Sequence, residues 1–251
     1  MEIRYLGPFD VVDADESIAV GGGRQRALLA ILALSAGEVV PVGRLIDELW
    51  PDHPPDSAQN TVQAYVSRLR KAMTVTAASV SLHASWIERR AGDLRAWEEA
   101  LRQGIETLDE LDERAYNSTL GIDLGECLYA QDRLDEVWEL CARTRAMSPP
   151  EDFVNFVYAD ALEGCVLVRR GLQEEALATL AHALELVETT DYAFTRADVR
   201  FYMADAHARL GNPDEAAAAA RDALAILDEK GDLAMAARFR ERLGSLGVVL
   251  A

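Results

Sequence analysis

The sequence predicts a mainly α-helical protein with two parts, a small α+β domain at the N-terminus and an array of paired helices after it. Three observations predict this class. Short β-type runs fill the first 20 residues, helical periodicity takes over from there, and segments in the second half recur at intervals of about 40 residues. A length of 251 residues and a hydrophobic content of 50% are sufficient for two separate cores.

The composition excludes several classes of protein. No run of about 18 apolar residues occurs, so we expect no membrane span. The opening stretch MEIRYLGPFDVVDADE is acidic and does not have the basic start and apolar centre of a signal peptide. Cys127, Cys141 and Cys165 are isolated within apolar helical patterns, which is typical of core residues in a reducing compartment. We therefore expect a cytoplasmic protein.

Turn residues divide the N-terminal part into short strands and three helices. Gly7-Pro8 and the acidic cluster Asp13–Glu16 break the β-type runs, as in a small antiparallel sheet. Gly37 ends the first helix and Pro51 ends the second. The expected strands are Ile3–Leu6, Phe9–Val12 and Ser17–Val20, and the expected helices are Arg24–Ala36, Val42–Trp50 and Ala58–Met73.

The third expected helix has two different faces. At about 100° per residue, one stripe is apolar and predicts the side that packs on the core. That stripe consists of Val62, Val66, Leu69 and Met73. The opposite face is polar or small and contains no acidic residue, and it consists of Asn60, Gln63, Ala64, Ser67, Arg68 and Lys71. Asn and Gln can bond adenine edges, and Arg and Lys can bond guanine or phosphates. Any soluble helix, however, has a polar outer face, so both interpretations stay open on periodicity alone.

The order of these elements indicates a family. The blocks GGGRQRALLAILAL, VVPVGRLIDELWP and SAQNTVQAYVSRLRKAM resemble the N-terminal domain of SARP-type (antibiotic regulatory protein) activators, which carry an OmpR-type winged helix. The likeness covers about residues 1–75 and implies that the helix Ala58–Met73 enters the major groove of DNA. The implied groove contacts are Asn60, Gln63, Ser67, Arg68 and Lys71, and the candidate phosphate contacts are Arg24, Arg26 and Arg70.

The continuation TVTAASVSLHASWIERR departs from that family. A winged helix follows its recognition helix with a β-hairpin, often ending in a Gly-Tyr turn, whereas no glycine, proline or turn pair occurs here. We expect Thr74–Leu82 to form one strand or a poor hairpin, so that a reduced wing extends the domain to about residue 85. Because a wing usually touches the minor groove or the backbone, its reduction predicts weakened or lost DNA binding.

The net charge of the chain also predicts weak DNA binding. The net charge is −18, whereas a nucleic-acid binder usually has a basic face. The first 75 residues hold 7 Lys/Arg and 10 Asp/Glu, so most of the acidity lies in the remainder. The field of the whole chain is therefore expected to slow its approach to DNA.

The second half, residues 86–251, contains repeats. The segments DRLDEVWELCARTRAMSPP, GLQEEALATLAHALELVE and GNPDEAAAAARDALAILD align, and Gly171 and Ala176 recur 40 residues later as Gly211 and Ala216. Each unit predicts two antiparallel helices, and the units resemble tetratricopeptide repeats. Such a solenoid implies a concave face that binds a protein or peptide, and homodimerisation through this half is a further expectation. The alternative is an array that packs only on itself and on the first domain.

No motif predicts an enzyme. Gly21–Gly23 precede Arg24-Gln25-Arg26 and do not have the Lys-Ser/Thr of a phosphate loop, and no HExxH, CxxC or GxSxG occurs. The histidines are too far apart in sequence to predict a metal site, and they are His53, His83, His182 and His207. We expect no cofactor and no metal.

The combined prediction is a mainly α protein that reads double-stranded DNA as a sequence-specific transcriptional regulator, with a small winged-helix domain followed by an α-helical repeat solenoid. The repeat domain would dimerise or bind a protein partner. Reversing Arg68 and Lys71 to Glu is predicted to abolish DNA binding and to leave the helical content unchanged. The rival hypothesis is a protein-interaction scaffold with a vestigial winged helix, which the net charge and the reduced wing favour.

Overall fold

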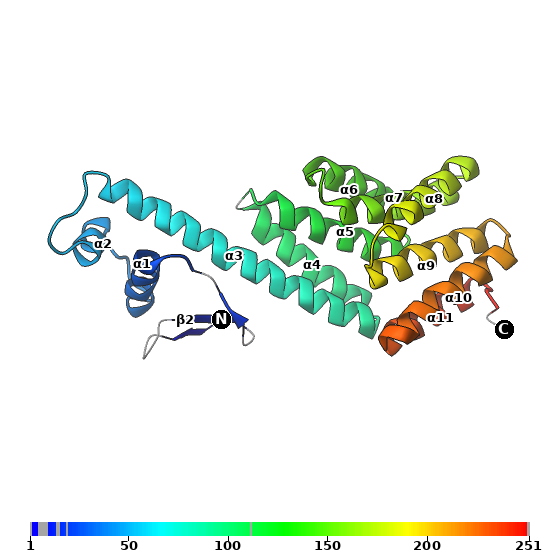
Figure 1. Cartoon of the computed structure of the whole chain (residues 1–251), viewed down its shortest axis with the longest axis horizontal. Coiled ribbons are helices and arrows are strands. Elements are labelled where there is room, and N and C mark those ends of the chain that lie inside the picture. The colour runs from blue at the N-terminus through cyan, green and yellow to red at the C-terminus, as the bar shows by residue number, and fades with distance from the viewer. Residues whose placement is uncertain (1, 5–9, 14–15, 19, 111, 250–251) are drawn as a thin grey trace. The chain divides into compact units, whose positions relative to one another are not determined.

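Helices dominate the chain (Figure 1). The structure, a computed structural model, describes residues 2–4, 10–13, 16–18, 20–110 and 112–249. It divides into two compact units, Met1–Ser79 and Val80–Ala251. The elements in order are β1 (Glu2–Arg4), β2 (Asp10–Asp13), β3 (Glu16–Ser17), α1 (Gly23–Leu34), α2 (Val42–Leu49), α3 (Ala58–Ala91), α4 (Leu94–Asp109), α5 (Arg114–Ala130), α6 (Leu134–Met147), α7 (Phe153–Arg169), α8 (Gln173–Glu188), α9 (Ala193–Arg209), α10 (Pro213–Lys230) and α11 (Leu233–Ser245).

The three strands form an antiparallel sheet in the order β1-β2-β3. Ile3 pairs with Val11, and Val12 pairs with Ser17. Val11 is fully buried because this face of the sheet covers the core of the first unit. The predicted small antiparallel sheet is confirmed, although β3 is shorter than the expected strand Ser17–Val20, and the parts of the expected strands at residues 5–9 and 19 lie outside the described residues.

One hydrophobic core holds the first unit together. Leu28 of α1, Leu45 of α2 and Leu69 of α3 are buried in it. The apolar stripe predicted for the third helix is confirmed, since Val62 and Leu69 are buried and Val66 and Met73 pack against them. The opposite face of α3 therefore points away from this core.

The expectation of a strand or hairpin at Thr74–Leu82 is wrong, because α3 continues as one helix to Ala91. Ala78, Leu82 and Ser85 are buried at helical spacing. The hydroxyl of Thr76 donates to the Ala72 carbonyl at 2.9 Å, a bond that only a helical backbone offers. Burial along one helical face thus overrides the β-propensity of this run. The helix leaves no hairpin wing in the described residues that follow the expected recognition helix.

The second unit is an array of helical hairpins (Figure 1). α5 packs on α6, α7 on α8, and α9 on α10, which are the three units expected from the repeats. Each turn contains one residue with a left-handed backbone, namely Asp132, Gly171 and Gly211, with φ of 59°, 78° and 77°. The predicted fold class, mainly α with a small α+β domain followed by an α-helical, solenoid-like array, is confirmed.

A fourth hairpin precedes these three. Gly92 has φ of 80° and lies 40 positions before Asp132, so the end of α3 and the whole of α4 repeat the same unit. Trp97 takes the place that Val137, Ala176 and Ala216 have in the other units, and all four are buried. The array therefore begins inside α3.

Small residues allow the helices to approach closely. A Cβ on Gly104 of α4 would lie 2.4 Å from Leu120 Cδ2 and 3.0 Å from Ser81 Cβ.

The three cysteines are buried and free, as expected of core residues. Among the helices of the described residues, none combines the length and hydropathy needed to cross a bilayer.

Candidate nucleic-acid interface

The face of α3 opposite the core is exposed over its first half. At about 1.5 Å per residue, the distance from Asn60 to Lys71 along the helix axis is about 16 Å, a little more than the width of the DNA major groove, about 12 Å. All six residues predicted for this helix are exposed there, and they are Asn60, Gln63, Ser67, Arg68, Arg70 and Lys71. Because the apolar stripe of α3 packs on the core, these six side chains all lie on the exposed side of the helix.

The polar groups of this face are available to a ligand. Within the described part of the chain, the side chains of Asn60, Gln63, Ser67, Arg68 and Arg70 make no hydrogen bond or ion pair. A guanidinium has five N–H donors and an amide has both a donor and an acceptor, so these groups can form bidentate bonds with base edges.

No acidic side chain of α3 itself lies beside the positive charges on its first half. The helix contains no Asp or Glu between Ala58 and Ile87, and its first acidic residue is Glu88. Charges interact strongly only within a Debye length, about 8–10 Å at physiological salt. Within α3, the charges nearest to this face are therefore those of Arg68, Arg70 and Lys71, and the helix adds no negative charge to them before Glu88.

The start of α1 provides a second group of cations. Arg24 and Arg26 are exposed in its first turn, which contains no acid, and the N-cap residue Gly22 forms no side-chain cap. The guanidinium of Arg24 lies 5.5 Å from the centre of the Trp50 ring, which joins α1 to the end of α2. Cations at a helix N-terminus oppose the helix dipole by about 0.3–1 kcal/mol each, and a bound phosphate would reverse that effect.

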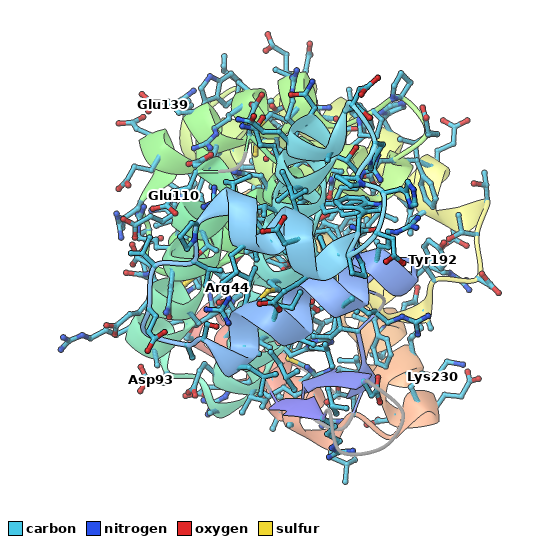
Figure 2. All side chains as sticks on the ribbon, turned by 90° about the vertical axis from the view of Figure 1, so that its left-hand side faces the viewer. Arg44, Asp93, Glu110, Glu139, Tyr192 and Lys230 are labelled. Atoms are coloured by element: carbon cyan, nitrogen blue, oxygen red, sulfur yellow. The ribbon has the colours of Figure 1, made fainter. Side chains whose placement is uncertain are left out.

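The eight predicted residues thus occupy two helices of the first unit, six on α3 and two on α1. Another basic residue of this unit, Arg44 of α2, has a different environment (Figure 2). Its Nε donates to Glu48 at 2.8 Å, so its charge is paired within the helix. Arg44 is therefore not a candidate DNA contact.

A polar cluster in the helical array was not predicted from the sequence. Arg89 Nη2 lies 2.9 Å from Asp198 Oδ1 and 3.1 Å from Glu126 Oε1. The hydroxyls of Tyr158 and Tyr202 donate to these two carboxyls, at 2.7 and 2.8 Å. The cluster joins the end of α3 to α5, α7 and α9. The 40-residue spacing from Gly92 to Asp132 is the sequence signal that could have assigned the end of α3 to the array.

Burial changes the acid–base behaviour of this cluster. It raises the pKa of Glu126 to about 8, even though Arg89 acts in the opposite direction. Burial alone would lower the pKa of Arg89, but Asp198 and Glu126 raise it well above its ordinary value. Arg89 therefore remains charged, and Glu126 is largely protonated at neutral pH.

In the described residues, no group of three or more His, Cys, Asp or Glu side chains is placed to hold a metal ion.

Comparison with known proteins defines the class of the first unit. Residues 19–86 match the family described as transcriptional regulatory protein, C terminal. The match includes the stretch in which α3 continues without a hairpin. The N-terminal part of the chain therefore carries a domain of the OmpR/PhoB type, as the resemblance implied.

The relatives are named regulators. The chain is 41% identical to Regulatory protein DnrI of Streptomyces peucetius over 75 residues, which cover 30% of this chain and 28% of the relative. It is 46% identical to Regulatory protein AfsR of Streptomyces coelicolor over 73 residues, 29% of this chain and 7% of the relative. It is 35% identical to Transcriptional regulatory protein EmbR of Mycobacterium bovis over 71 residues, 28% of this chain and 18% of the relative. The predicted SARP-type likeness is confirmed for the first part of the chain, which spans less than a third of each of these relatives.

Proposed function

We propose that this protein is a sequence-specific DNA-binding transcriptional regulator. The observation that carries the proposal is the exposed, acid-free face of α3 in a domain of the transcriptional regulatory family. In a chain with a net charge of −18, thirty consecutive helical residues without an acid, Ala58–Ile87, are what a helix that approaches phosphates requires.

The side chains of α3 suit different groups on DNA according to their chemistry. Asn60 and Gln63 suit bidentate bonds to adenine, and Arg68 and Lys71 suit guanine or phosphates, with Ser67 between them. Arg70 at the edge of this face, and Arg24 and Arg26 at the start of α1, are the phosphate contacts. Phosphate contacts fix the register of the protein on the duplex, and the base contacts supply specificity.

The helical-repeat domain is proposed to bind a protein or peptide partner or a second copy of the chain. Tyr192, at the start of α9 (Figure 2), and Phe194 each have 49% of their surface exposed. Phe153 stacks on Tyr192 with ring centres 5.6 Å apart. Aromatic rings at a surface are typical of protein interfaces. The acidity of this half of the chain favours a basic partner.

The proposal includes three further statements about the whole protein. It acts in the cytoplasm, it needs no cofactor and it is not an enzyme. Support for the last comes from the relatives, which are named as regulators. The last statement would have to be abandoned if catalysis were detected with the purified chain.

Selection from a randomised duplex library at moderate salt tests the proposal. The full chain is compared with a variant in which Arg68→Glu and Lys71→Glu are combined. Enrichment of a sequence motif by the unaltered chain alone supports a regulator that reads DNA through α3. Enrichment by both proteins contradicts the assignment of α3.

A second function has one specific observation in its favour. The continuation of α3 to Ala91 replaces the hairpin with which a winged helix usually holds the DNA backbone. On this view the protein is an interaction scaffold and its first domain is vestigial. No enrichment, together with no binding to any duplex at low salt, would establish this alternative over the regulator.

A further inference from the structure

A cavity of about 330 Å³ lies inside the helical array, among the end of α3 and helices α4, α5, α9 and α11. Its volume is within the range of small-molecule sites, about 300–1,000 Å³. Its walls are mainly apolar and aromatic, with Trp97, Tyr129, Tyr202 and Phe239 among them. Phe201, which also lines the cavity, stacks on Phe239 with ring centres 4.2 Å apart.

Two buried polar atoms on the lining side chains have no partner. They are Nε1 of Trp97, a residue 5% exposed, and Oε2 of Glu126, a residue 2% exposed. A buried polar atom without a hydrogen bond costs about 1–3 kcal/mol, and folded proteins contain few of them. Only four such side-chain atoms occur in the described part of the chain, and two of the four belong to this one cavity. This coincidence indicates a ligand with polar groups.

The charges around the cavity indicate which polar groups the ligand has. Three guanidinium groups line it, those of Arg89, Arg238 and Arg242, against the carboxyls of Glu126 and Glu241. Arg238 donates to Glu241 at 2.7 Å and also to the carbonyls of Arg90 and Ala91, and Arg242 Nη1 donates to the Ala130 carbonyl at 3.3 Å. Because each guanidinium has five donors, these bonds leave further N–H groups. Burial raises the pKa of Glu126 to about 8, so this carboxyl can also donate a proton at neutral pH. The lining is thus rich in donors.

We propose that this cavity binds a flat aromatic molecule that carries a carbonyl or carboxylate oxygen. The rings lie against the aromatic walls, and the oxygen accepts the unpaired N–H of Trp97. The oxygen belongs either to a neutral carbonyl group or to a charged carboxylate, and the experiment below distinguishes these two groups. The site shares no residue with the proposed DNA interface, because every residue that lines it belongs to the unit Val80–Ala251.

Calorimetric titration of the full chain with three naphthalene probes tests this site. The probes are 2-naphthoate, 2-naphthamide and 2-naphthylmethylamine, which share one ring system and differ in charge and in acceptor. We expect one molecule of the amide or the carboxylate to bind per chain, and the amine to bind at least about tenfold more weakly. Stronger binding of the carboxylate assigns a charged oxygen, and stronger binding of the amide assigns a neutral one.

Variants locate the bound probe. Trp97→Phe keeps the ring and removes the N–H donor, so we expect binding to weaken about tenfold, the effect of one lost hydrogen bond. Ser245→Trp places a large ring at an exposed edge of the cavity and should abolish binding without disturbing the core. Trp138→Phe is the matched control, because Trp138 does not line the cavity and packs under Arg170 instead, 4.5 Å from its ring centre.

Three results would overturn the proposal. The first is that none of the probes binds at millimolar concentration. The second is that the amine binds as tightly as the amide and the carboxylate, which contradicts the donor-rich lining. The third is that the Trp97→Phe and Ser245→Trp variants bind the probes as the unaltered chain does, which places them elsewhere.

Discussion

Arg89 Nη2 lies 2.9 Å from Asp198 Oδ1, and this ion pair joins two residues that are 109 positions apart. Arg89 belongs to the end of α3, and Asp198 belongs to α9 in the last of the repeated hairpins. Glu126 of α5 meets the same guanidinium. One arginine therefore connects the first hairpin of the array with its second and fourth.

Removal of Asp198 should destabilise the array. Asp198→Ala leaves Arg89 without one carboxylate and the Tyr158 hydroxyl without its acceptor. Breaking a buried ion pair costs about 3–5 kcal/mol, and because Glu126 still faces Arg89 we expect a loss of about 3 kcal/mol in the free energy of unfolding. Urea denaturation measures it. The matched control is Asp191→Ala, an exposed position, which should change the free energy by less than about 0.5 kcal/mol. Equal effects of the two changes would contradict this role of Asp198.

Glu126 should make the stability depend on pH. Burial raises the pKa of this carboxyl to about 8 in the folded chain, while Arg89 opposes the shift and Asp198 and Asp123 add to it. In the unfolded chain the value is about 4.3. The folded state therefore holds a proton that the unfolded state releases, so this group lowers stability as pH rises from about 4.3 to about 8.

Glu126→Gln removes this dependence because an amide does not titrate. The melting temperature of the variant minus that of the unaltered chain should therefore increase between about pH 5 and about pH 8.5. Thermal unfolding at both pH values measures this difference. A constant difference would contradict the raised pKa of Glu126.

Gly104 marks a close approach of helices that a methyl group would disrupt. A Cβ at this position would lie 2.4 Å from Cδ2 of Leu120, which is fully buried, and 3.0 Å from Cβ of Ser81. We expect Gly104→Ala to cost about 1–3 kcal/mol of stability, as overpacking does. Gly244→Ala in α11 is the control, because its Cβ would meet no atom within 4 Å and alanine favours a helix. Unchanged stability of Gly104→Ala would show that the helices can separate.

Arg26 should contribute to affinity for DNA without contributing to specificity. The logarithm of the binding constant falls with the logarithm of salt concentration by about 0.9 for each neutralised phosphate on duplex DNA. We expect Arg26→Ala to reduce this slope by about 0.9 and to leave the preferred sequence unchanged. Arg26 is the cleaner choice, because Arg24 also packs over Trp50. A changed sequence preference would mean that Arg26 contacts a base.

The sequence predicted the exposed face of α3 because the position of this face depends only on the period of the helix. Val62 and Leu69 fix which side is buried, and the position of Arg68 follows. The length of α3 could not be predicted in this way. The run from Thr74 to Val80 is rich in β-branched residues and favours a strand, but burial of Ala78 and Leu82 at helical spacing decides for the helix.

The first hairpin of the array could not be recognised from the sequence because of one residue, Trp97. Trp97 occupies a position at which two of the other units have alanine, so the segment after Gly92 does not resemble them in composition. The partners of Arg89 could not be predicted either, since they lie 37 and 109 positions away and meet it only through the packing of the hairpins. Periodicity predicts which face of a helix is buried, whereas contacts between distant helices need the fold.

The affinity for an enriched duplex, measured by fluorescence anisotropy, tests the central claim most directly. The charge-reversed pair Arg68→Glu and Lys71→Glu is compared with Arg95→Glu and Arg221→Glu, two exposed arginines of the array that change the net charge equally. We predict that the α3 pair loses binding, with the helical content unchanged by circular dichroism, and that the array pair binds nearly as the unaltered chain does. Equal losses in both pairs, or retained binding by the α3 pair, would contradict recognition of DNA through α3.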